Sequence, residues 1–294
     1  MPTSVGELIE LLDLEAIDVN LFRGTQPDTR LQRVFGGQVA AQALVAGART
    51  VADPLVVHSL HSYFLRPGDT AVPIVYDVER IRDGRSFSAR RIAARQHGRA
   101  IYYMTASFQV PEDGLDHQDV MPVVSAPEDS LDLSELFRSR SLGSVAEWLR
   151  EWAVLELRYV GDTRPGGGIP SSDHPSQSRL WIRVSPSPGS DGSGKLGDER
   201  LLHQAAFTYA SDMTLLGTAL VPHGLHIGHP KLQSASLDHT IWFHRPFRAD
   251  EWLLYDQVSP SASGGRGLAI GRLFTLDGVL VASVAQEGLI RLRS

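Results

Sequence analysis

Two stretches of the 294-residue chain are versions of one pattern: Asp238-His-Thr-Ile-Trp-Phe-His-Arg-Pro246 and Leu60-His-Ser-Tyr-Phe-Leu-Arg-Pro67. Both place aromatic and histidine residues ahead of an Arg-Pro pair. A glycine follows each copy at nearly the same interval, because Gly98 lies 31 positions beyond the first Arg-Pro pair and Gly278 lies 32 beyond the second. Matched spacing over this distance indicates that the chain is an internal duplication of one structural unit.

Each copy begins a series of short apolar segments separated by turn signals such as Pro-Gly-Asp, Asp-Gly-Arg and His-Gly. Such segments predict strands. We expect strands at residues 56–65, 71–81, 86–96 and 99–110 in the first half, and at 236–245, 252–259, 267–275 and 279–291 in the second. A helix is expected before each series. The first, at 37–50, is rich in Ala and Gln, and the second follows an apolar stripe with helical spacing from Leu202 to Leu220.

A helix followed by hairpin-joined strands is typical of an antiparallel sheet packed on one long helix. The expected fold class is therefore α+β, with this arrangement present twice. The pattern also predicts a helix at 4–12, a strand at 14–23, a helix at 134–152 and strands at 158–161 and 179–184. We divide the chain into a first unit at 1–110, a linker with a helix at 111–153, and a second unit at 154–294.

Composition restricts the classes of function. The formal net charge is −6, which argues against general nucleic-acid binding because such proteins normally present a basic face. The chain has no cysteine, so disulfides, thiolate metal sites and a cysteine nucleophile are excluded. No segment approaches the roughly 18 consecutive apolar residues of a membrane span, and the N-terminus lacks the basic segment of a signal peptide. We expect a cytoplasmic protein.

Several longer strings resemble the acyl-CoA thioesterase II family. They include Val34-Phe-Gly-Gly-Gln-Val-Ala-Ala-Gln-Ala43, Tyr103-Met-Thr-Ala-Ser-Phe-Gln109, Tyr209-Ala-Ser-Asp212 and Gln286-Glu-Gly288, besides the two Arg-Pro stretches. The strings are long, occur in order and cover nearly the whole chain. The resemblance implies a double hot-dog fold, meaning two tandem units that each wrap an antiparallel sheet on a long helix.

The resemblance also implies a catalytic set. In that family an Asp, a Thr or Ser, and a Gln hold and activate a water that hydrolyses a fatty acyl-CoA thioester. The matching positions here are Asp212, Ser236 and Gln286, with Ser standing where many members have Thr. It further implies an acyl-CoA substrate, no metal or other cofactor, and a homodimer of double hot-dog units.

These residue types suit the chemistry. A thioester expels a thiolate whose conjugate acid has a pKa near ~8.5, so the leaving group needs little protonation. The reaction instead needs a positioned water and stabilisation of the developing negative charge. Asp212 is a weak base at its ordinary pKa, so burial must raise that pKa, or the residue mainly orients the water. Gln286 offers a donor and an acceptor that do not titrate.

The position of Asp212 has two readings. The apolar stripe places it in the middle of a helix, whereas an alignment of the two halves places it opposite Gln38, just after Gly36-Gly37. Either the helix is broken near Tyr209, or the backbone donors that stabilise the reacting oxygen come from elsewhere.

The first half lacks the catalytic set. In the alignment Gln38 occupies the Asp position and Val57 the Ser position, while Ala106 or Ser107 occupies the Gln position. We therefore predict one catalytic centre per chain, near the interface of the halves, with the first half contacting the acyl group or CoA.

Two rival functions stay open. A non-catalytic module that binds or senses acyl thioesters would share the fold, but the retained Asp, Ser and Gln argue against it. A hydratase or dehydratase of this fold would need a catalytic His with an acid. His239 beside Asp238 is the nearest candidate, and strand alternation from Ser236 predicts that it faces away from the site.

Other charged or histidine-rich motifs have simpler explanations. His58 and His61 point to opposite faces of a strand, so a shared metal is not expected. His223, His226 and His229 lie in a Gly/Pro loop with no carboxylate ligand beside them. A basic stretch either meets the CoA phosphates or forms a solvated sheet edge. It comprises Arg85, Arg90, Arg91, Arg95 and Arg99.

Overall fold

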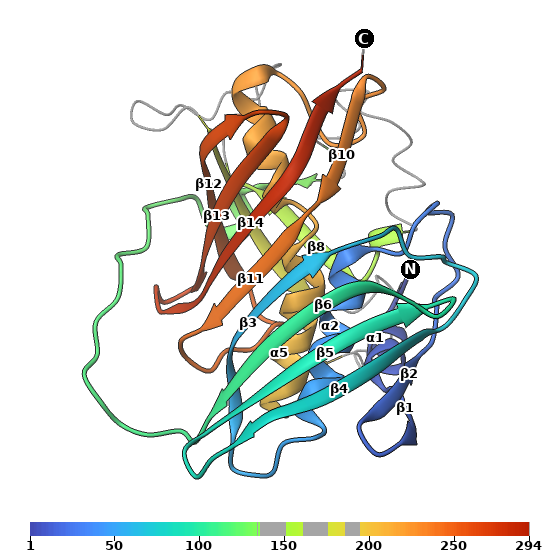
Figure 1. The fold of residues 1–294 in the computed structure, drawn as a ribbon. Helices are drawn as coiled ribbons and strands as arrows, with labels where there is room; N and C mark the ends of the chain where they lie inside the picture. The colour runs from blue at the N-terminus through green and yellow to red at the C-terminus, as the bar shows by residue number, and fades with distance from the viewer. Residues whose placement is uncertain (134, 136–150, 161–175, 186–194, 294) are drawn as a thin grey trace.

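The computed structural model describes residues 1–133, 135, 151–160, 176–185 and 195–293 (Figure 1). Its helices are α1 (Val5–Leu12), α2 (Gly36–Ala48) and α5 (Arg200–Ser211), with 3₁₀ segments η1 (Pro127–Asp129) and η2 (Leu215–His223). The strands of the first half are β1 (Glu15–Asp18), β2 (Leu21–Gly24), β3 (Val56–Phe64), β4 (Ile74–Asp83), β5 (Phe87–Gln96) and β6 (Arg99–Gln109). Those that follow are β7 (Leu131–Asp132), β8 (Leu155–Tyr159), β9 (Gln177–Val184), β10 (Leu232–Ser236), β11 (Asp238–Phe243), β12 (Leu253–Ser263), β13 (Arg266–Thr275) and β14 (Leu280–Leu292).

The described strands form one antiparallel sheet in the order β1-β2-β4-β5-β6-β3-β11-β14-β13-β12-β9-β8-β7, with β10 also paired to β14. The order β4-β5-β6-β3 of the first half returns reversed in the second half as β11-β14-β13-β12. The two Arg-Pro stretches meet in the middle of the sheet, where β3 and β11 pair and Leu60 lies opposite Ile241. This mirrored order is what a duplicated unit produces when its two copies share a sheet.

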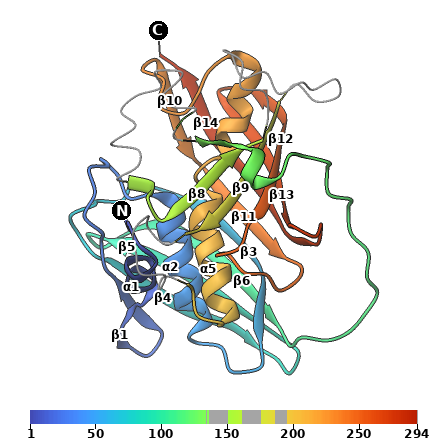
Figure 2. The same cartoon turned by 180° about the vertical axis from the view of Figure 1, so that it is seen from behind.

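The long helices α2 and α5 lie side by side against one face of this sheet, as both views show (Figures 1 and 2). Their contact faces are apolar and fully buried, with Ala40 and Leu44 on α2 and Phe207 on α5 among the core residues. At one end the helices come unusually close, because a Cβ atom on Gly37 would overlap the Tyr209 carbonyl oxygen. Only glycine fits there, so the first turn of α2 lies against the last turn of α5.

Three expectations for the elements need correction. Residues 14–23 form a hairpin of β1 and β2 rather than one strand, with Asn20 at a left-handed φ of 61° in the turn. The helix expected from Leu202 to Leu220 ends at Ser211 and continues as η2, whose buried Leu216 and Leu220 preserve the apolar spacing. The strand expected at 236–245 is divided into β10 and β11 at Leu237.

The segment that joins the halves runs around the outside of the second half without regular structure between β6 and η1 (Figure 1). It is attached to that sheet by polar contacts. Asp116 pairs with Arg245, Asp119 pairs with Arg272 at 3.0 Å, and Gln118 donates to the Gly278 carbonyl oxygen at 2.8 Å. β7 then pairs with β8. The helix expected at 134–152 lies largely outside the described residues.

Candidate active site

Asp212, Ser236 and Gln286 lie in direct contact although they are far apart in the sequence. The Ser236 hydroxyl donates to Asp212 Oδ1 at 2.9 Å. The Gln286 amide Nε2 donates to the same carboxylate oxygen and lies 2.9 Å from Ser236 Oγ. The three side chains thus form a closed triangle of polar groups.

Three elements hold this triangle. Asp212 follows the last residue of α5, Ser236 is the last residue of β10, and Gln286 lies within β14. β10 and β14 are antiparallel partners, with Ser236 opposite Gly288. Since α5 ends at Ser211, the break that one reading of the sequence required is present, and it turns the carboxylate toward the strands.

The first half completes the surroundings of Asp212. A Cβ on Gly36 would lie 2.5 Å from Asp212 Oδ2, and the backbone N–H of Gly37 donates to the carboxylate. Both residues belong to the first turn of α2, whose free N–H groups and positive dipole favour a negative charge. The alignment that placed Gln38 opposite Asp212 is therefore wrong. Gln38 lies at the start of α2 and Asp212 at the end of α5, so the two residues are not equivalent, and they come near each other only because the helices pack together.

Burial dominates the acid–base behaviour of Asp212. It raises the pKa of this carboxyl from 3.8 to about 6, while the hydrogen bonds from Ser236, Gln286 and Gly37 act in the opposite direction. Desolvation penalises the charged form more than these donors stabilise it. The result is a carboxylate that is ionised at neutral pH and basic enough to accept a proton from water.

A β-bulge at Leu237 sets the direction of Ser236. Ser236 pairs with Gly288 and Thr240 with Ala285, so the strand carries one more residue than its partner between these pairs. The Leu237 N–H donates to the Glu287 carbonyl at 2.9 Å, and its carbonyl accepts from the Phe64 N–H at 2.9 Å. The first half has the same irregularity in β3, between Val57 and Ser59.

Because of this bulge, the prediction that His239 faces away from the site is wrong. His239 is fully buried, and its Nε2 lies 2.8 Å from the hydroxyl of Ser211, which precedes Asp212. Burial lowers the pKa of His239 to about 3, so its imidazole is neutral. Among the described residues its Nδ1 has no hydrogen-bond partner, and so no carboxylate forms the His–acid pair that a hydratase needs.

The first half has a different side chain where the second half keeps its site. Arg90 lies opposite Ala106 on the β5–β6 ladder, as Ala269 lies opposite Gln286 on the β13–β14 ladder. This register makes Ala106, not Ser107, the counterpart of Gln286.

Arg90 fills the space that Ala269 leaves open. Its side chain is 1% exposed, donates to the Thr50 hydroxyl at 2.7 Å at the end of α2, and pairs with Asp83. A buried guanidinium therefore lies in the first half at the position that corresponds to the polar triangle of the second.

A cavity of about 330 Å³ opens beside the triangle. Ser236 and Gly36, which both contact Asp212, belong to its lining, and Phe64 and Tyr102 contribute aromatic walls with ring centroids 5.0 Å apart. The volume is at the lower end of the range for small-molecule sites. The remaining lining residues are Arg33, Val34, Val39, Leu65, Arg66, Pro67, Gly68, Ile101, Ser234, Ala235 and Leu237.

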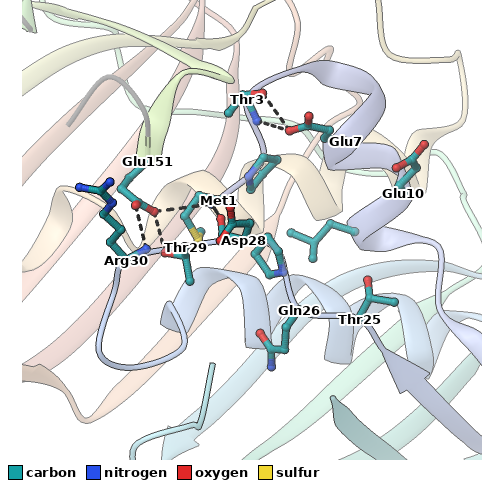
Figure 3. Close-up of a pocket in the computed structure, with 13 residues that line it drawn as sticks. Met1, Thr3, Glu7, Glu10, Thr25, Gln26, Asp28, Thr29, Arg30 and Glu151 are labelled. Atoms are coloured by element: carbon teal, nitrogen blue, oxygen red, sulfur yellow. Dashed lines mark hydrogen bonds and ion pairs between the residues drawn. The ribbon is translucent and has the colours of Figure 1, made fainter. Parts of the chain in front are cut away.

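A second cavity, of about 490 Å³, lies in the first half near α1 and contains none of the three residues (Figure 3). Several of its polar groups have partners within the protein. Glu151 accepts from the Thr29 hydroxyl at 2.6 Å and from the Arg30 N–H at 3.0 Å, and its carboxylate lies 3.5 Å from the Met1 amino group (Figure 3). These contacts attach residue 151 to the loop before α2.

The basic stretch of the first half is mostly neutralised within the protein. Arg90 pairs with Asp83, Arg91 with Glu79, and Arg95 lies 3.8 Å from Asp77. The reading of this stretch as a solvated sheet edge is wrong, because β5 is paired on both sides, by β4 and β6, and Arg90 is buried. The ion pairs also leave less positive charge for the phosphate site that the other reading requires.

Comparison with known proteins identifies the family. Residues 25–109 match the family model described as acyl-CoA thioesterase N-terminal domain, and residues 190–289 match the model described as acyl-CoA thioesterase. Together they cover more than half of the chain. The chain belongs to the acyl-CoA thioesterase family.

Individual relatives agree with this assignment. The chain is 40% identical to acyl-CoA thioesterase 2 of Haemophilus influenzae over 99% of both chains. It is 41% identical to human acyl-coenzyme A thioesterase 8, over 96% of this chain and 88% of that protein. The crystal structure of the acyl-CoA thioesterase II TesB2 from Mycobacterium marinum superposes with a TM-score of 0.81 at 45% identity, covering 98% and 99% of the two chains.

These comparisons confirm the predicted family and double hot-dog fold, and the chain is an acyl-CoA thioester hydrolase by family. Within the part of the chain that the structure describes, no helix is long and apolar enough to cross a membrane. In that same part, no three His, Asp or Glu side chains are grouped so that they can hold a metal ion.

Proposed function

We propose that this protein hydrolyses fatty acyl-CoA to a free fatty acid and CoA, using a water held by Asp212, Ser236 and Gln286. The observation that carries the proposal is the hydrogen-bonded triangle of these side chains, one of which, Ser236, lines a cavity. Membership of the acyl-CoA thioesterase family supplies the substrate class.

The unused acceptors of the triangle suit a water molecule. Gln286 directs its amide nitrogen at Asp212 and Ser236, and its buried Oε1 has no partner among the described residues. Asp212 Oδ1 accepts from both neighbours, whereas Oδ2 lies beside Gly36, and a carboxylate oxygen can accept a hydrogen bond from water in addition to one from the protein. A water molecule can donate one hydrogen bond to Oδ2 and one to Oε1. The lone pairs of its own oxygen would then point away from these two acceptors, toward a bound thioester.

The reaction then proceeds by simple proton and bond changes. The water oxygen bonds to the thioester carbonyl carbon while Asp212 accepts one water proton. The tetrahedral intermediate expels the CoA thiolate as its C–S bond breaks, and the fatty acid keeps the water oxygen. The proton on Asp212 passes to the thiolate or to solvent. The thiolate is a good leaving group because its conjugate acid has a pKa near ~8.5.

The test is release of free thiol from acyl-CoA esters of short, medium and long chain, measured for wild type and Asp212→Asn. A matched control is Asp113→Asn, since Asp113 is exposed in the joining segment. Turnover that requires Asp212 but not Asp113 supports the proposal. Acyl-CoA binding without turnover at any chain length would instead identify the non-catalytic binding or sensing module.

Three further expectations belong with this proposal. The division at 1–110, 111–153 and 154–294, the cytoplasmic location and the homodimer of double hot-dog units all stay predictions. Light scattering of the purified protein tests the dimer, because a mass close to the 32.2 kDa of one chain would contradict it.

A further inference from the structure

The cavity beside the catalytic triangle has two arginines at its rim. Arg33 precedes α2 and Arg66 follows β3, so the cations come from separate segments of the first half. Both side chains are exposed. Ser236 and Gly36 line the same cavity, so the two exposed arginines and a member of the polar triangle face one space.

Among the described residues these two arginines have no counter-ion, whereas others, such as Arg91 and Arg272, each pair with a carboxylate. The Arg66 guanidinium donates to the Ala100 carbonyl oxygen at 2.7 Å, and within the described ranges neither Arg33 nor Arg66 has a carboxylate within ion-pair distance. The equivalent arginine of the second half does have a counter-ion. Arg245, which occupies the place of Arg66 in the second copy, is paired with Asp116 of the joining segment.

A third cavity, which lies at the C-terminal end of β14, allows a comparison. It has a volume of about 490 Å³ and is lined by Leu220, Leu232 and Leu292 among others, but its only arginine, Arg266, pairs with Glu287 at 3.0 Å. Free positive charge is thus found at the cavity that reaches Ser236 and not at this one. In a protein with a net charge of −6, such a local excess favours an anionic ligand.

We propose that Arg33 and Arg66 bind the phosphate groups of CoA, so that the cavity holds the pantetheine arm. The inference rests on the proposed function and assigns the orientation of the substrate in that site. The neutral arm, with its amides and methyl groups, fits walls that combine Val34, Leu65 and Ser234. Guanidinium groups bind phosphate through charge-assisted and often bidentate hydrogen bonds.

The experiment compares two thioesters with the same decanoyl group, decanoyl-CoA and decanoyl-N-acetylcysteamine, of which only the first carries phosphates. Arg33→Ala and Arg66→Ala are each expected to lower kcat/KM for decanoyl-CoA by about fivefold, mainly through KM, because an exposed charged contact is lost. Turnover of the truncated thioester should change less than twofold. The difference should shrink in high salt, which screens exposed charges.

Two further variants make the result specific. Arg85→Ala removes another exposed arginine, from the turn between β4 and β5, and should leave the turnover of both substrates unchanged. Arg66→Lys keeps the positive charge and should recover most of the loss. Equal losses on both thioesters, no loss on either, or a loss matched by Arg85→Ala would overturn the assignment. Wild type that hydrolyses neither thioester would instead refute the proposed function itself.

Discussion

At the scale of single residues, the protonation state of Asp212 decides what the site can do. Its carboxylate is buried enough that the pKa rises to about 6, yet three donors keep the charged form accessible at neutral pH. Ser236 and Gln286 do not titrate in this range, so they hold the geometry at all relevant pH values. Three predictions belong to this scale.

The first concerns Asp212→Asn. The amide occupies the same space but cannot accept a proton from water, so kcat should fall by ~10²-fold or more. Circular dichroism and the urea midpoint would check that the fold survives. Full activity in a folded variant would remove Asp212 from the mechanism.

The second concerns pH. If Asp212 is the base, kcat should rise with pH through a single group with a midpoint near 6.

The raised pKa also means that the folded protein binds a proton between pH ~4 and ~6 that the unfolded chain has lost, so the stability from this group falls as pH increases across that window. Urea unfolding at several pH values should show this slope, and Asp212→Asn should lack it. Substitution of Gln286, which donates to Asp212, should shift the midpoint of the rise in kcat with pH. A midpoint that does not move would contradict the assignment of this rise to Asp212.

The third concerns Ser236→Thr. The added methyl group restricts χ1 and keeps the hydroxyl, so kcat should stay within about threefold of wild type. Ser236→Ala should lose more, because Asp212 and Gln286 would each lose a hydrogen-bond partner. A collapse of kcat in Ser236→Thr alone would show that the site has no room for the methyl group.

At the scale of elements, two local irregularities build the site. The bulge at Leu237 brings Ser236 and His239 to the buried side of the sheet, although simple alternation predicts opposite sides. The close approach of α2 and α5 brings the Gly37 N–H to Asp212. Neither element alone contains a complete site.

Gly37→Ala tests the helix contact. The added methyl group would overlap the Tyr209 carbonyl oxygen, so the helices must separate. Overpacking of this kind costs about 1–3 kcal/mol of stability. We expect that loss in urea unfolding, together with a lower kcat, because the donor to Asp212 moves away. Gly114→Ala is the matched control, since nothing lies within 4 Å of a Cβ there. Unchanged stability and kcat in Gly37→Ala would contradict the close packing.

At the scale of the whole molecule, duplication has produced two unequal halves. The second half supplies the three polar side chains, and the first half supplies the turn of α2 beside them and most of the adjoining cavity. The place in the first half that corresponds to the triangle is filled by Arg90, which is held by Thr50 and Asp83. This arrangement predicts a single catalytic centre per chain.

Arg90→Leu tests that prediction. Removing the buried guanidinium leaves the Thr50 groups without their donor, so stability should fall by about 2–4 kcal/mol. The kcat of the folded fraction should stay within about twofold of wild type, because the triangle in the second half is untouched. A loss of kcat as large as that of Asp212→Asn would show that the first half also carries out chemistry.

Sequence patterns predicted much of the architecture because local periodicity reports which face of an element is buried. The first long helix and seven of the eight expected hairpin strands lie where the pattern placed them, apart from shifted ends, whereas the strand at 236–245 is divided and the second helix ends at Ser211. The same patterns failed wherever a turn preserves apolar spacing. Leu216 and Leu220 continue the stripe of α5 from a 3₁₀ segment, and Asn20 turns the chain inside an apparently continuous strand.

The amino-acid sequence alone determined the duplication, the α+β class, the family resemblance and the candidates Asp212, Ser236 and Gln286, because each can be read from residues that are neighbours in the chain or from matched strings. Tertiary structure alone decided how these candidates meet: the bulge at Leu237, the Gly37 donor and the Arg90 side chain in the first half. It also decided that Arg33 and Arg66 line the cavity beside Ser236 without an ion-pair partner among the described residues. These features depend on contacts between segments tens to hundreds of residues apart, and no local pattern records such contacts.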